Sequence, residues 1–143
     1  MKPGHLMMTA IVAVALTSCS SVAPVKVSAG DQCFRCRRSI MDERLAGETI
    51  DANGFVSKFR APGCMAKYLA AHPSETGTVF VTDYATGKMM NPDAALFVPV
   101  VVDRNTGEHE YRAYRLRPDA NVAAGELGAA PVDWKTVLEK ARM

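Results

Sequence analysis

Two cysteines separated by two residues, Cys33 and Cys36, carry the most evident chemistry in this sequence. They lie in the segment CFRCRRSIM, where arginines surround both thiols and a thioether follows at Met41. A C-x-x-C pair can form a disulfide, exchange electrons with another thiol pair, or contribute two ligands to a metal ion. Basic neighbours lower the pKa of a thiol and favour the thiolate, which is the form that attacks disulfides and binds metals.

The first 18 residues have the features of an export signal. A basic residue at Lys2 precedes a short apolar run and then small residues, a pattern too short to remain as a membrane span. The run ends in LTSC at residues 16–19, which resembles the bacterial lipobox, in which the cysteine is lipidated and becomes the mature N-terminus. We therefore predict a signal peptide over residues 1–18 and lipidation at Cys19. The protein would be exported and anchored at the periplasmic face of a membrane, with the outer membrane favoured because Ser20 follows the cysteine.

After Cys19, residues 20–30 read SSVAPVKVSAG, a small, polar, proline-containing stretch without a helical or strand pattern, so the segment 19–30 has no element of its own. We predict that it is a lipidated tether and that one metal-binding domain occupies residues 31–143. The chain has 17 Lys and Arg residues against 15 Asp and Glu residues. Because it is nearly neutral, it has no electrostatic reason to bind nucleic acid or anionic lipid. Its attachment to the membrane is expected to be covalent, through the lipid at Cys19.

An odd number of cysteines is left once Cys19 carries lipid, namely Cys33, Cys36 and Cys64. Exported proteins meet an oxidising compartment in which structural thiols usually pair, so an odd cysteine is either free or held by something else. A metal held by thiolates would account for all three. A Cys33–Cys36 disulfide beside an inert, buried Cys64 is the alternative that the residues leave open. A zinc finger would need further ligands at similar spacing, and a thioredoxin-like site would need a strand before the C-x-x-C.

Further soft donors follow along the chain. Cys64 lies in the first turn of a predicted helix, where the helix N-terminus lowers the pKa of a thiol, and Met65 adjoins it. Met89, Met90 and His109 come later. Thiolate and thioether ligands favour monovalent copper, whereas carboxylates and water favour hard ions. The donor set therefore points to Cu(I), although a methionine on a helix or strand is commonly a core residue.

The elements that must position these donors predict an α+β fold, with a small, mainly antiparallel sheet built from β-β-α-β units and helices on one side. Two short runs, 46–51 and 55–59, flank Ala-Asn-Gly and predict a hairpin. A helix is expected from Pro62, which suits a first turn, to the residue before Pro73. Later segments predict strands at 78–84, 94–103 and 108–116, a soft Ala/Gly-rich stretch at 121–130, and a closing helix capped by Asp133.

Between Cys33 and about Val98, behind the lipobox, the chain contains four telling segments: CFRCRRSIMDERLAGE, GCMAKYL, FVTDYATGKMM and NPDAALFV. In this order and spacing they resemble the NosL family of lipid-anchored accessory proteins, which are associated with assembly of the copper centre of nitrous oxide reductase. The resemblance implies a β-β-α-β unit seen twice, binding of a single Cu(I), and delivery of that ion to an apo-enzyme without catalysis.

The family commonly shows C-x-x-C-x-M, with the second cysteine and the methionine as copper ligands, and in this chain Arg38 occupies the methionine position. The resemblance therefore implies Cys36 as the essential ligand, Met41 as the replacement thioether, and Cys33 as an auxiliary ligand or redox partner. Further candidate ligands are Met89, Met90 and His109, and the supporting residues are Cys64, Met65 and Asp83.

We expect a Cu(I)-binding metallochaperone, and not an enzyme, that passes copper to apo nitrous oxide reductase or to another copper enzyme. Two alternatives stand beside it. One is a thiol–disulfide reductant that acts on a metalloprotein's cysteines through Cys33 and Cys36. The other is a structural lipoprotein stapled by a Cys33–Cys36 disulfide.

Overall fold

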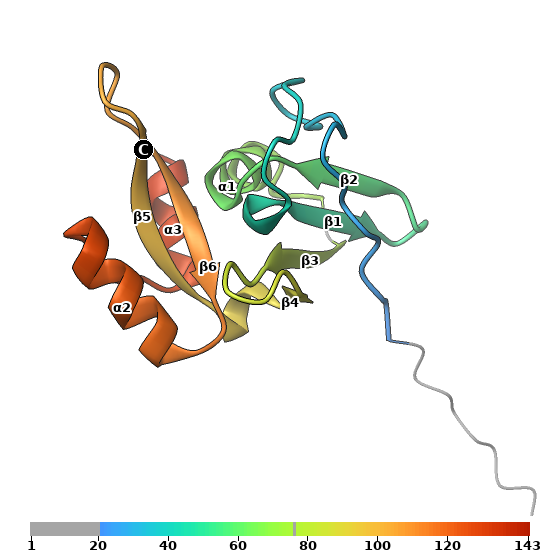
Figure 1. Cartoon of the computed structure of the whole chain (residues 1–143). Helices are drawn as coiled ribbons and strands as arrows, with labels where there is room; N and C mark the ends of the chain where they lie inside the picture. Colours follow the sequence, from blue (N-terminus) through green and yellow to red (C-terminus); the bar gives the residue numbers. More distant parts are fainter. Residues whose placement is uncertain (1–20, 76) are drawn as a thin grey trace, which may run out of the picture.

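The computed structural model describes residues 21–75 and 77–143. The predicted signal peptide and the predicted lipidation site Cys19 lie outside these residues. Antiparallel strands in two sheets, together with α-helices packed on them, make up the described part (Figure 1). This confirms the predicted α+β class. No helix in the two described ranges combines the length and the apolar content that crossing a membrane requires.

The larger sheet has four strands in the order β2-β1-β3-β4, all paired antiparallel. Its strands are β1 (Gly47–Asp51), β2 (Val56–Phe59), β3 (Gly77–Thr82) and β4 (Met89–Met90). β1 and β2 form the hairpin that Asn-Gly predicts, and Gly54 in its turn has a φ of 81°, which favours glycine. Helix α1 (Pro62–Ala71) follows β2, so the predicted β-β-α-β unit is confirmed.

A second unit repeats this order. Strands β5 (Leu96–Asp103) and β6 (Glu108–Tyr114) form a two-stranded antiparallel sheet, and helix α2 (Arg117–Leu127) follows them. The chain then returns as a single antiparallel bridge between Val132 and Phe97, in the place that a fourth element would take. Short 3-10 turns, η1 (Glu43–Leu45) and η2 (Pro92–Ala94), precede the first strand of each unit. The doubling implied by the family resemblance is therefore visible in the fold.

Helix α2 replaces the soft stretch that the sequence predicts at 121–130. Pro118 lies in its first turn and Gly128 ends it in a left-handed conformation, so both termini carry ordinary helix signals. Its only buried residues are alanines, at 120, 123 and 124, which pack on Val98 and Tyr114. Such a helix lacks a strong apolar stripe, so its packing against the sheet, more than its own pattern, makes it helical.

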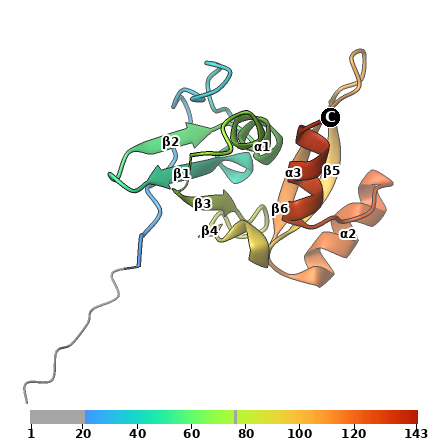
Figure 2. The ribbon, with the colours of Figure 1, turned by 180° about the vertical axis from the view of Figure 1, so that it is seen from behind.

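The main core lies between the two sheets. Helix α1 lies there and contacts both β6 and helix α3 (Trp134–Ala141), as the views from opposite sides show (Figures 1 and 2). The largest buried residues of this core include Phe59, Met65, Val81 and Phe97, and Cys33 and Cys64 belong to the same cluster. Two thiols are therefore held inside a packed interior.

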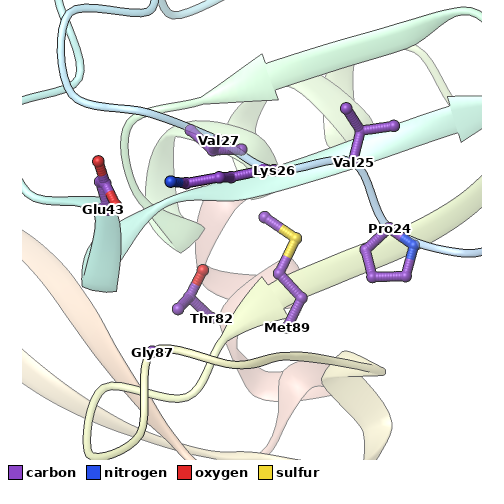
Figure 3. A pocket seen from close by; sticks show the side chains of 8 residues that line it. All are labelled: Pro24, Val25, Lys26, Val27, Glu43, Thr82, Gly87 and Met89. Atoms are coloured by element: carbon purple, nitrogen blue, oxygen red, sulfur yellow. The ribbon is translucent and has the colours of Figure 1, made fainter.

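The strap, defined as residues 24–30, runs across the other face of the larger sheet (Figure 3). The Val25 N–H donates to Glu48 Oε1 at 2.6 Å, and Lys58 Nζ donates to the Lys26 carbonyl at 3.1 Å. Val27 is buried, and a cavity of about 280 Å³ lies between the strap, Thr82 and Met89. Residues 24–30 of the segment predicted as a tether are thus fixed to the domain.

Candidate metal centre

A tight loop presents the first two cysteines. An isolated bridge joins Gln32 to Ser39, and the Cys33 N–H donates to the Arg38 carbonyl at 2.9 Å. Arg37, which closes the turn, has a φ of 62°, and its N–H donates to the Cys33 carbonyl at 2.9 Å. The Phe34 N–H donates to the Lys58 carbonyl of β2 and ties the loop to the sheet. Backbone hydrogen bonds therefore fix the loop before any metal binds.

The third cysteine lies in the first turn of α1. Ala61, at the N-cap, supplies no side-chain hydrogen bond, and Pro62 opens the helix. The missing cap comes from β6, because the buried Glu110 carboxylate accepts from the Gly63 N–H at 3.0 Å. A Cβ at Gly63 would meet Glu110 Oε2 at 2.5 Å, so only glycine leaves room for this contact. The second half of the chain thereby fixes the turn that carries Cys64.

The sulfur atoms of Cys33, Cys36 and Cys64 all lie within 4.8 Å of one another. The Cys33 and Cys64 sulfurs are 3.5 Å apart, and all three cysteines are free. Two thiolates on one zinc ion, each with a bond of about 2.3 Å, are at most about 4.6 Å apart. The three sulfurs therefore need to move little to share one thiophilic ion, and the soft donor set suits monovalent copper.

The three thiols differ in exposure and acidity. Cys33 and Cys64 are buried, whereas Cys36 is half-buried. The expectation that the helix N-terminus lowers the pKa of Cys64 is wrong, because burial, reinforced by the charges of Cys33 and Cys36, raises this pKa to about 12. Burial also opposes ionisation of Cys36, but the Arg38 N–H, the other two thiols and the charge of Arg60 outweigh it and hold the pKa of Cys36 below its ordinary value. Cys36 is therefore the accessible sulfur and the one that ionises readily.

A small pocket of about 110 Å³ lies beside Cys36 and Cys64. Arg60 reaches into it between the thiols and β6, where Arg60 Nη2 lies 3.0 Å from Glu108 Oε1 and 3.8 Å from Glu110 Oε1. The remaining lining residues are Arg35, Arg38 and Lys67. The site is thus a thiol group bordered by a largely basic pocket.

None of the other predicted ligands lines the cysteine pocket. Met41 is 83% exposed, and Met89 lines the cavity under the strap, which shares no lining residue with the cysteine pocket (Figure 3). Met90 is a buried member of the main core. His109 is exposed, and because Glu108 and Glu110 on either side of it line the cysteine pocket, it points to the opposite face of β6.

Two of the predicted supporting residues, Met65 and Asp83, make packing and hydrogen-bond contacts that hold the fold. Met65 is fully buried over β1, where a Cβ at Gly47 would meet its Cε at 2.9 Å. The Asp83 carboxylate accepts from the Thr86 hydroxyl at 2.6 Å and from the Arg115 N–H at 3.2 Å, and so links the turn after β3 to the end of β6. Cys64 supports the core as well, but its sulfur is also part of the thiol group.

Four residues that line the cysteine pocket are absent from the sequence prediction: Arg60, Lys67, Glu108 and Glu110. Arg60 precedes Cys64 by only four residues, whereas the two glutamates come from β6, more than forty residues away. Their spacing of two on a strand indicates a shared face, but nothing in the sequence indicates what that face meets.

No protein-family model and no curated protein sequence matches this chain. Among solved structures, the crystal structure of the copper chaperone NosL from Shewanella denitrificans is similar. The two share a TM-score of 0.60 and 19% sequence identity, over 78% of this chain and 96% of the other. At this identity the similarity establishes a shared fold, and it confirms the fold that the sequence resemblance implies.

Proposed function

We propose that this chain is a divergent NosL-type copper chaperone that holds one Cu(I) at Cys33, Cys36 and Cys64. The observation that carries the proposal is the approach of three free thiols to within 4.8 Å of one another. The fold shared with a copper chaperone supports it, as does the preference of thiolates for monovalent copper. No catalytic role is proposed.

The difference between the three thiols suits a carrier. Cys33 and Cys64 hold the ion from the buried side, while Cys36 keeps one side of the site open to solvent. A thiolate or imidazole of an acceptor protein can bind the ion at that side, and the buried cysteines then release it one bond at a time. Ligand exchange of this kind needs no net redox change and leaves three thiols ready for the next ion.

The anchor and the client extend this proposal. We propose that Cys19 carries lipid, that the domain works at the periplasmic face of a membrane, the outer one favoured, and that the acceptor is apo nitrous oxide reductase or another copper enzyme. These points are supported by the lipobox at residues 16–19 and by the segments that resemble NosL. Met41 remains a predicted thioether ligand, because it lies five residues after Cys36 in the chain and its side chain is exposed.

One contact favours a second candidate function. The 3.5 Å approach of the Cys33 and Cys64 sulfurs makes these two, more than the C-x-x-C pair, the partners that could close a disulfide. In this role Cys36 would attack a disulfide of another protein, release one of its thiols and form a mixed disulfide with the other. Cys33 would then attack the Cys36 sulfur and release the second thiol, and Cys64 would attack Cys33, which frees Cys36 and leaves a Cys33–Cys64 disulfide. A reductant of this type would show a defined disulfide potential and turnover with a thiol source.

Titration of the reduced, purified protein with Cu(I) against a chromogenic chelator tests the proposal. We expect one equivalent to bind tightly and Cys36→Ala to lose this binding. His109→Ala is the matched control, since it removes a donor on the opposite face of β6 and should leave the affinity unchanged. Failure of the wild-type protein to bind Cu(I), together with turnover in a disulfide-reduction assay, would instead favour the reductant.

A further inference from the structure

Arg60 is placed unusually for a charged residue. Its side chain is only 22% exposed and lines the same pocket as Cys36 and Cys64. On one side its guanidinium pairs with Glu108 and approaches Glu110. Its Nε, however, is fully buried and has no hydrogen-bond acceptor among the described residues. A buried N–H without an acceptor is rare and calls for a ligand or partner.

A metal-bound thiolate is the acceptor that this site can supply. Cysteines bind metals as thiolates, and the resulting sulfur accepts hydrogen bonds and carries negative charge. Although burial opposes it, the charges of Glu110, Cys36 and Cys64 raise the pKa of Arg60, which is consistent with a guanidinium close to these sulfurs. Loading of the thiols would thus give the Nε of Arg60 a partner.

The charge of the loaded site depends on the ion. Three thiolates around a monovalent ion leave two negative charges, whereas around a divalent ion they leave one. A fixed positive charge therefore favours the complex of the monovalent ion by one additional charge–charge interaction. Arg35, Arg38 and Lys67 add to this field, but Arg35 and Arg38 are exposed and hence better screened by salt than Arg60.

We propose that Arg60 determines the metal specificity of the thiol site and favours monovalent over divalent thiophilic ions. The inference rests on the proposed function, because it concerns the same three cysteines. Glu108 has a role in the same inference: its carboxylate lies 3.0 Å from the guanidinium of Arg60, so its negative charge offsets part of the positive potential that Arg60 produces at the sulfurs.

The test is the ratio of the Cu(I) affinity to the Cd(II) affinity, each measured by chelator competition and by the sulfur-to-metal absorption band. Removal of the charge in Arg60→Gln should lower this ratio by about a hundredfold to a thousandfold, as expected for one unit charge about 4–6 Å away at an effective dielectric constant of about 20. Arg60→Lys keeps the charge and should keep the preference within about threefold. Glu108→Gln should shift the ratio in the opposite direction, toward Cu(I).

Arg37→Gln is the matched control, because it removes the same charge from the cysteine loop at a side chain that lies over the Phe34 ring, outside the pocket. Its ratio should equal that of the wild type. An unchanged ratio in folded Arg60→Gln, or in Glu108→Gln if the former does not fold, overturns the inference and leaves the copper-binding proposal standing. A wild-type protein that binds no Cu(I) overturns both.

Discussion

Replacement of Gly63 by alanine should break the hydrogen bond by which Glu110 caps the first turn of α1. The Gly63 N–H donates to the buried Glu110 carboxylate at 3.0 Å, and an added Cβ would lie 2.5 Å from the same oxygen. The carboxylate would have to move away, so that α1 would lose the only side-chain cap described for its first turn. Because Glu110 also approaches Arg60, the displacement would reach the thiol pocket.

The size of the effect follows from two opposing contributions. A hydrogen bond to a charged group contributes about 1.5–3 kcal/mol to stability. Replacement of glycine by alanine inside a helix returns up to about 1 kcal/mol through helix propensity. We therefore expect a net loss of about 1–2 kcal/mol, which for a domain of this size lowers Tm by about 3–8 °C.

Thermal unfolding followed by circular dichroism measures the change. Gly125→Ala in α2 is the matched control, because a Cβ at that position would meet nothing within 4 Å. It should gain stability, by up to about 1 kcal/mol, from the same propensity term. If Gly63→Ala also melts at or above the wild-type temperature, the Glu110 cap does not hold α1 and the reasoning about the pocket fails with it.

Four further predictions follow from the site, the strap and the anchor. Cys36→Ala should abolish Cu(I) binding in a chelator competition. Cys64→Ser should weaken Cu(I) binding, because it removes a sulfur that lies 3.5 Å from the sulfur of Cys33. If Cys64→Ser keeps the wild-type affinity for Cu(I), Cys64 only supports the fold. Met41→Leu should weaken binding at unchanged stoichiometry, and an unaltered sulfur count at copper by X-ray absorption would remove Met41 from the ligand set. Glu48→Gln should raise Tm at pH 7, because burial raises the pKa of Glu48 and the folded state loses stability as this carboxylate ionises with rising pH. The gain in Tm should vanish below the ordinary pKa of 4.5, where the carboxyl group is protonated in both states. A difference in Tm that does not depend on pH would contradict this origin. Cys19→Ser should release the protein from the membrane fraction, and continued membrane attachment would refute the lipobox.

Local signals account for the parts of the fold that the sequence predicts. The Asn-Gly turn, the proline at the start of α1 and the Asp133 cap of α3, which accepts from the Thr136 N–H at 2.8 Å, each act within a few residues. α2 escapes prediction because its alanines become informative only when they meet Val98 and Tyr114. Helix propensity without a strong apolar stripe does not distinguish it from a loop.

The candidate metal centre also has a part that the local sequence predicts and a part that only the packing of distant segments determines. Cys33 and Cys36 are recognisable from their spacing, but the approach of Cys64 depends on the packing of α1 against a loop thirty residues earlier. Arg60 contacts Glu108 across 48 residues, and Glu110 caps the start of α1 at Gly63 across 47 residues, so their places in the site depend on the packing of α1 against β6. His109 is a residue type that often binds metals, but the alternation of side chains along β6 places it on the face opposite the cysteine pocket.

The docked strap limits how far the domain can lie from an anchor at Cys19. If Cys19 carries lipid, only residues 20–24 lie between the anchor and Val25, the first residue of the strap hydrogen-bonded to the sheet, and such a connection spans at most about 20 Å. The domain would then move as a particle confined to a thin layer above the bilayer, with one face of its larger sheet turned toward the anchor. Encounters with an acceptor would depend on lateral diffusion and on the effective concentration at that surface, more than on the bulk concentration of either protein.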